Sequence, residues 1–162
     1  MKSILVLLLS LFVTPFTFAQ TSKVICIFPD NDTLWIGTFG GLIKYNIKTD
    51  RSFCYTMANS GLTSDKVQSF AKDSKDNLWV GCYTGGVSFF KNGIFNNMFP
   101  ETNTAIFTGN YCSGMYVDKN DMVYFGSNHS LKSIYNNQLE SMSIGKPTSS
   151  DYQTVNKIIE AP

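Results

Sequence analysis

The chain has 162 residues, which is enough to bury the core of one domain. Its charge is nearly balanced, with 13 Lys and Arg against 12 Asp and Glu, so the basic patch typical of nucleic-acid-binding proteins is not expected. Aromatic residues make up 14% of the chain and glycines number 12, a combination that favours half-buried strands joined by tight turns.

The first 19 residues have the pattern of a cleaved signal peptide. Lys2 precedes the apolar run Ile4–Phe12, and Thr17-Phe18-Ala19 offers a small-residue cleavage site before Gln20. The apolar run is too short for a spanning helix, which needs about 20 apolar residues, and Pro15 also argues against a membrane anchor. We therefore expect an exported, periplasmic protein with no membrane span after cleavage, and a folded part over residues 20–162.

From residue 23 onward the pattern predicts strands only, separated by Gly, Asn and Asp turns. The segment between the first two groups of strands, residues 58–66, is expected to be a polar link. The predicted strands are residues 24–28, 34–38, 42–46 and 52–56; then 67–71, 78–82, 87–91 and 94–99; then 112–117, 123–127, 131–135 and 139–144; and finally 155–159.

One motif recurs along the chain. LWIGTFGGLIKY at 34–45 returns as LWVGCYTGGVSFF at 78–90 and, altered, as MVYFGSNHSLKSIY at 122–135. Trp35 and Trp79 are 44 residues apart, and Gly81 and Gly126 are 45 apart. Four-stranded units of 40 to 50 residues are typical of β-propeller blades. We predict an all-β fold: a partial β-propeller with three four-stranded antiparallel blades over about residues 23–57, 66–100 and 111–145, and a fourth beginning at about 154.

The repeated residues have physical roles in such a fold. Trp35 and Trp79 would fill the space between adjacent blades, and the mid-strand glycines Gly37 and Gly81 would let a neighbouring chain come close. Three blades leave two open apolar sides. We therefore expect the chain to be the front part of a longer protein, or to assemble with the remaining blades or with a partner subunit.

Residues 34–46 (LWIGTFGGLIKYN) and 77–93 (NLWVGCYTGGVSFFKNG) resemble the two-component regulator propeller repeat. The likeness is weaker over 110–137, where Tyr124 replaces the Trp. The resemblance implies a non-enzymatic, ligand-sensing region at the front of a periplasmic hybrid histidine kinase, with glycan fragments as ligands and the kinase part absent from this chain. Two alternatives stay open: a secreted or surface scaffold for protein interaction, and a fragment of a propeller polysaccharide lyase or glycosidase.

Ligands of propellers usually meet the loops that join second to third strands. Those loops contain Phe39, Tyr83, Asn128 and His129, which we predict as ligand-binding residues for an oligosaccharide. In the alternative interpretation, Phe39 and Tyr83 merely pack between blades.

The sequence predicts no catalytic residues, metal site or cofactor. The acidic turns lack the alternating ligands and closing Glu of a calcium loop, and His129 has no partner ligands nearby in the sequence. The four cysteines fit no metal template and are expected to be buried thiols with at most one disulfide, at positions 26, 54, 82 and 112.

Overall fold

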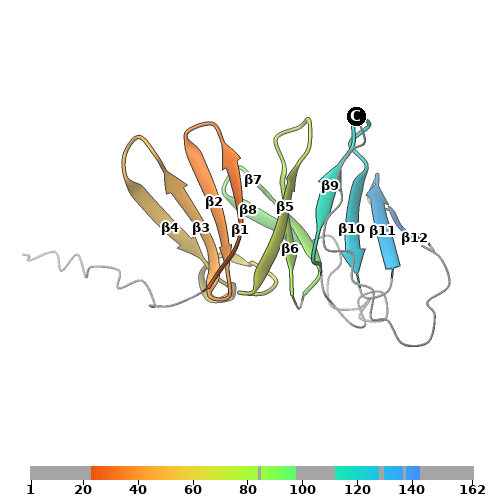
Figure 1. Cartoon of the computed structure of the whole chain (residues 1–162), viewed down its shortest axis with the longest axis horizontal. Helices are drawn as coiled ribbons and strands as arrows, with labels where there is room; N and C mark the ends of the chain where they lie inside the picture. Colours follow the sequence, from red (N-terminus) through yellow and green to blue (C-terminus); the bar gives the residue numbers. More distant parts are fainter. Residues whose placement is uncertain (1–22, 84, 98–111, 128–129, 137, 143–162) are drawn as a thin grey trace, which may run out of the picture.

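The computed structural model describes residues 23–83, 85–97, 112–127, 130–136 and 138–142, which form three four-stranded antiparallel sheets side by side (Figure 1). In each sheet the strands follow one another in sequence order. Blade 1 contains β1 (Val24–Asp30), β2 (Thr33–Thr38), β3 (Gly41–Asn46) and β4 (Arg51–Tyr55). Blade 2 contains β5 (Val67–Lys72), β6 (Leu78–Cys82), β7 (Val87–Lys91) and β8 (Ile94–Asn97). Blade 3 contains β9 (Met115–Val117), β10 (Val123–Ser127), β11 (Ser130–Tyr135) and β12 (Gln138–Met142).

This arrangement confirms the predicted fold class, and the three sheets do not close into a ring. The signal peptide predicted at residues 1–19 and the fourth unit predicted from about 154 lie outside the described residues. Within the described part of the chain, no helix is long and apolar enough to cross a membrane.

The structure differs from the prediction in two places. A single helical turn, α1 (Met57–Ser60), begins the link that was predicted to be a polar loop. The Asn59 side chain accepts a bond from the Thr56 backbone at 2.8 Å, and Gly61 ends the turn at φ 74°. A helix of four residues is stabilised by its capping residues, and it is too short for its sequence to show a helical pattern of hydrophobic residues. The first strand of blade 3 begins at Met115, three residues later than predicted.

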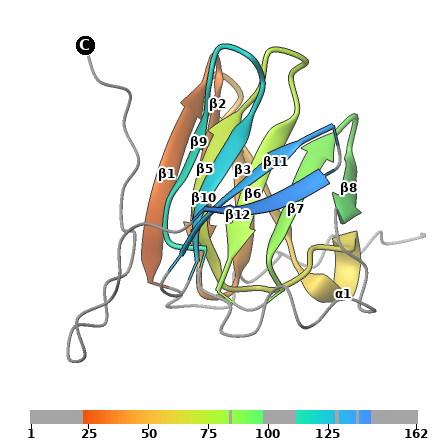
Figure 2. The same ribbon diagram turned by 90° about the vertical axis from the view of Figure 1, so that its right-hand side faces the viewer.

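Successive blades stack through two hydrophobic clusters. β1 contacts β5, and β5 contacts β9, so that the first strands of the three blades lie together along one side (Figure 2). The Trp35 ring packs edge-on against Phe90 of blade 2, with ring centroids 5.2 Å apart. Trp79 lies in the cluster between blades 2 and 3, against Phe125 and its neighbours. Both tryptophans therefore fill the space between blades, as predicted.

The mid-strand glycines mark the points where blades approach most closely. A Cβ atom on Gly37 would lie 2.9 Å from Val67 Cγ1 of blade 2. A Cβ on Gly81 would lie 2.4 Å from Cys112 Sγ, next to blade 3, and equally close to Ser69 Oγ. Only glycine leaves room for these contacts, which confirms the role predicted for both residues.

We expect Gly81→Ala to lower the free energy of unfolding by about 1–3 kcal/mol, because the added methyl group overpacks the blade 2–blade 3 boundary. Urea denaturation followed by fluorescence measures the change. The matched control is Gly61→Asn: Gly61 has open space around it and a left-handed backbone that Asn tolerates. A neutral Gly81→Ala, or an equal loss in the control, would contradict the close-approach explanation.

Candidate functional site

The turn between β5 and β6 is built around the carboxylate of Asp73. Its oxygens accept hydrogen bonds from the Lys75 backbone at 3.0 Å, from the Asn77 backbone at 2.9 Å and from the Asn77 amide at 2.6 Å. The indole Nε1 of Trp79 donates a further bond at 2.9 Å. The acidic turn therefore organises the backbone and ties it to the tryptophan between the blades, which is what the sequence predicted in place of calcium binding.

Blade 3 repeats this arrangement with a different aromatic residue. Asp118 accepts bonds from the backbones of Asn120 and Met122, and the Tyr124 hydroxyl donates to it at 3.4 Å. In blade 1 the position six residues before Trp35 is Pro29, which has no side-chain acceptor. The buried Trp35 Nε1 consequently has no hydrogen-bond partner.

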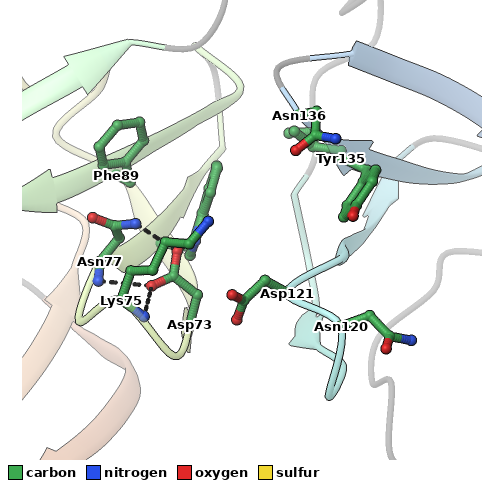
Figure 3. A pocket seen from close by; sticks show the side chains of 10 residues that line it. Asp73, Lys75, Asn77, Phe89, Asn120, Asp121, Tyr135 and Asn136 are labelled. Atoms are coloured by element: carbon green, nitrogen blue, oxygen red, sulfur yellow. Dashed lines mark hydrogen bonds between the residues drawn. The ribbon is translucent and has the colours of Figure 1, made fainter.

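The two acidic turns form part of a groove between blades 2 and 3, with a volume of about 340 Å³ (Figure 3). Blade 2 provides one wall and blade 3 the other. The Asp121 carboxylate bridges the walls by accepting bonds from the Ser74 backbone at 2.9 Å and from the Ser74 hydroxyl at 2.7 Å. The lining residues are Asp73, Lys75, Asn77, Trp79, Phe89, Asn120, Asp121, Ile134, Tyr135 and Asn136.

The groove combines aromatic surface with amide groups. The Tyr135 side chain is 47% exposed and lines the groove from blade 3, whereas Phe89 and Asn77 lie on the blade 2 side (Figure 3). The Asn77 Oδ1 atom is buried without a hydrogen-bond partner. An exposed ring beside amide donors and acceptors suits a polar ligand that also has an apolar face, such as a sugar.

The carboxylates of the groove are occupied by hydrogen bonds within the protein. Bonds from the Ser74 hydroxyl and backbone lower the pKa of Asp121, with a smaller contribution from the Lys75 charge. Asp73 is held by its own turn. Both carboxylates in the described lining of the groove therefore serve as acceptors for groups of the protein itself.

Two of the four ligand-binding residues predicted from sequence lie at the other end of the strands. Phe39, 46% exposed, lies in the β2–β3 turn, and Tyr83 begins the β6–β7 loop. The Tyr83 ring is half-buried, with Lys66 Nζ 5.0 Å from its centroid. The groove instead uses the β5–β6 and β9–β10 turns, at the top of Figure 1. The other two predicted residues, Asn128 and His129, lie outside the described residues.

The sequence prediction missed the residues that line the groove. The sequence pattern predicts turns at Asn77, Asn120 and Asn136 and the end of a strand at Tyr135, without assigning them to a ligand site. The available signal was the repetition of Asp–Asn turns in consecutive blades, which places amides on one rim.

A second hollow, of about 430 Å³, runs along the first strands of the three blades. Its lining combines apolar side chains with polar groups and consists of residues 25–28 of β1, 68–70 of β5 and 113–115, which lead into β9. Gln68 Oε1 is buried there without a partner.

All four cysteines are free thiols. Burial raises the pKa of Cys26 and of Cys112 to about 12, and that of Cys82 to about 11. These three thiols therefore behave as small apolar residues. The predicted burial holds for Cys82 and Cys112, whereas Cys26 and Cys54 are half-buried. Among the described residues, no group of three or more His, Cys, Asp or Glu side chains could hold a metal ion.

Residues 61–84 match the family model of the two component regulator propeller. This stretch covers α1's glycine cap, the link, β5, β6 and the start of the following loop. The chain thus carries one recognised copy of this repeat, in the blade whose sequence resembles the family most. The comparison with curated proteins gave no significant match.

Similar solved structures include extracellular domains of bacterial signalling proteins. One belongs to BT4673 of B. thetaiotaomicron, described as a one component system (TM-score 0.67, 19% identity, 76% of this chain and 17% of that chain). Another belongs to BT3049 of the same organism, described as a hybrid two component system (TM-score 0.67, 20% identity, covering 81% of this chain and 18% of that chain). The chain is also similar to an inactive variant of virginiamycin B lyase from Staphylococcus aureus, solved with quinupristin (TM-score 0.62, 14% identity, covering 79% of this chain and 43% of that chain).

These similarities support the propeller fold. The chain spans less than a fifth of the length of the two extracellular domains, and less than half of the lyase.

We expect Asp73→Ala to lower the free energy of unfolding by roughly 1.5–3 kcal/mol, because the turn loses a charged acceptor and the Trp79 indole N–H loses its partner. Thermal or urea unfolding gives the value. Asp76→Asn in the same turn is the control, since Asn tolerates the left-handed backbone of this position and the exposed carboxylate that is lost makes a surface ion pair with Lys72. Similar losses in the two variants would contradict the assigned role of Asp73.

The buried thiols predict a loss of stability at alkaline pH. Their pKa values are raised in the folded state, whereas thiols of the unfolded chain ionise near pH ~8.5. The contribution of the protonated thiols to the free energy of unfolding is therefore complete below about pH 8.5. It declines as the pH rises toward the thiol pKa values of the folded state. Comparing the melting temperature of the wild type and Cys112→Ala from neutral to alkaline pH isolates the effect. The variant should show the shallower decline, and parallel curves would contradict the prediction.

Proposed function

We propose that this chain, which carries a two-component regulator propeller repeat, is a non-enzymatic part of the extracellular sensing region of a hybrid two-component system. The observation that carries the proposal is the three-blade arrangement around that repeat, which is also found in the extracellular domains of BT4673 and BT3049.

An exported location agrees with this role. The pattern of residues 1–19 predicts a cleaved signal peptide. The similar B. thetaiotaomicron structures are extracellular domains. Both observations support a periplasmic or otherwise exported position for the blades.

We further propose that the ligand is an oligosaccharide, bound in the groove between blades 2 and 3. The Tyr135 ring offers a face on which a sugar ring can stack, and the exposed residues Asn120 and Asn136 offer amide groups for its hydroxyls. Asp121 and Ser74 join the two walls, so a ligand held between the walls would stabilise their relative position.

A second candidate function is that of a propeller enzyme, and the structural similarity to virginiamycin B lyase favours it. Cleavage of a glycosidic bond by the common route needs two carboxyl groups, one of which must be protonated. In the described groove both Asp73 and Asp121 are held as hydrogen-bond acceptors. We therefore favour binding without turnover.

The two functions are separated by titration calorimetry of the full chain against a panel of plant and microbial oligosaccharides, with the products analysed by chromatography afterwards. A sensor binds at least one oligosaccharide and leaves it intact. Cleavage of any of them would overturn the sensing proposal, and the absence of binding across the panel would favour a scaffold for protein interaction.

We expect Tyr135→Ala to weaken binding of such an oligosaccharide about tenfold, which corresponds to the loss of an aromatic contact worth about 1.4 kcal/mol. The matched control is Phe39→Ala, which removes an equally exposed ring from the opposite end of the strands. The dissociation constants are measured by calorimetry. If Phe39→Ala weakens binding and Tyr135→Ala does not, the ligand binds at the β2–β3 and β6–β7 loops instead.

A further inference from the structure

The groove between blades 2 and 3 carries more negative than positive charge. Among the described residues that line it, Asp73 and Asp121 bear carboxylates, and Lys75 bears the one ammonium group. Asp73 belongs to the blade 2 wall and Asp121 to the blade 3 wall (Figure 3). A ligand in the groove therefore lies between two carboxylates.

Both carboxylates are half-buried and held in place by hydrogen bonds. Asp73 accepts bonds from the backbone and the side-chain amide of Asn77 and from the indole of Trp79. Asp121 accepts bonds from the Ser74 backbone at 2.9 Å and from the Ser74 hydroxyl at 2.7 Å. These two bonds lower the pKa of Asp121, so it stays ionised at neutral pH.

The Lys75 ammonium is not fixed in the same way. Its side chain is exposed, and a strongly hydrated ammonium on a flexible stem favours the solvent. The Lys75 charge also lowers the pKa of Asp121 less than the bonds from Ser74 do. The charges that the fold fixes in the groove are therefore both negative.

The boundary between blades 1 and 2 has a cation where the groove has an uncharged ring. Lys44 pairs there with Trp35, and its ammonium lies 5.2 Å from the centroid of the Trp35 ring. In the groove, Phe89 pairs with Trp79 at the same register. A lysine thus fits at this position of a blade, and the groove lacks the cation that would attract an acidic ligand.

We propose that the groove selects neutral oligosaccharides and discriminates against sugars that carry a carboxylate or sulfate group. This inference rests on the proposal that the groove binds an oligosaccharide, and it specifies the class of sugar. Hydroxyl groups of a neutral sugar can donate hydrogen bonds to the carboxylates and to the amide oxygens of Asn120 and Asn136. An acidic group can only accept such bonds, and it would lie near two like charges. The Tyr135 ring can stack on either kind of sugar, so the charge decides between them.

The test is titration calorimetry of the full chain at low ionic strength with matched pairs of disaccharides. The members of a pair differ only in a carboxylate that replaces the primary hydroxyl: cellobiose and its diuronate, galactobiose and digalacturonate, mannobiose and dimannuronate. At least one neutral sugar should bind, and about fivefold or more tightly than its acidic counterpart. Added salt should narrow this difference, because it screens the repulsion between the charges.

Asp121→Asn removes one of the two charges and keeps the geometry of the wall. Asn tolerates the left-handed backbone of this position (φ 62°), and its amide oxygen can still accept the bonds from Ser74. The variant should reduce the preference for the neutral sugar about twofold or more. The matched control is Asp50→Asn on blade 1, where Asp50 has a similar backbone (φ 54°) and accepts a bond from the Tyr45 hydroxyl at 2.8 Å. The control should keep the preference of the wild type.

Two results would overturn this inference and leave the proposed oligosaccharide ligand intact. One is equal or tighter binding of the acidic members by the wild type. The other is an unchanged preference in an Asp121→Asn variant that melts at a temperature close to that of the wild type. Binding of none of these sugars would overturn the oligosaccharide ligand itself, and the inference with it.

Discussion

The close approach of one blade to the next at a mid-strand glycine is the constraint on which the rest of the structure depends. Gly37 and Gly81 leave room for Val67 and Cys112, and this lets the first strands β1, β5 and β9 lie together. The aromatic residue two positions earlier then fills the wider space between the sheets. Sheets held in this way diverge outward, and a groove opens where their turns separate.

The groove between blades 2 and 3 follows from this stacking. Its walls are turns organised by Asp73 and Asp118, whose carboxylates fix the backbone and bind the aromatic residue beneath. The Asp118 turn thus also carries Asn120, which lines the groove, while Tyr135 of β11 adds an exposed ring beside it. Blade 1 has Pro29 at the position of Asp73 and leaves the Trp35 indole N–H without a partner, which shows that stacking does not require a carboxylate at this position. The groove forms between blades 2 and 3, which share a turn held by an Asp carboxylate.

Much of the fold could be predicted from the sequence because it is local and periodic. The Asn92-Gly93 turn and the repeated Trp-x-Gly strands placed most strands within one or two residues of their positions. The helix α1 was missed because four residues held by Asn59 and Gly61 carry no periodic signal. The groove was missed because it forms where turns of different blades meet: Asn77 and Tyr135 are distant in sequence, and only the packing brings them to one site.

The central functional claim is that a ligand enters the groove between blades 2 and 3, and the two tryptophans allow a direct measurement. Trp79 lines the groove, whereas Trp35 is buried between blades 1 and 2. In a nitrogen–proton correlation spectrum of the full chain, titration with a binding oligosaccharide should shift the indole resonance of Trp79 and leave that of Trp35 in place. An unchanged Trp79 resonance at saturating ligand, or equal shifts of both, would contradict this account.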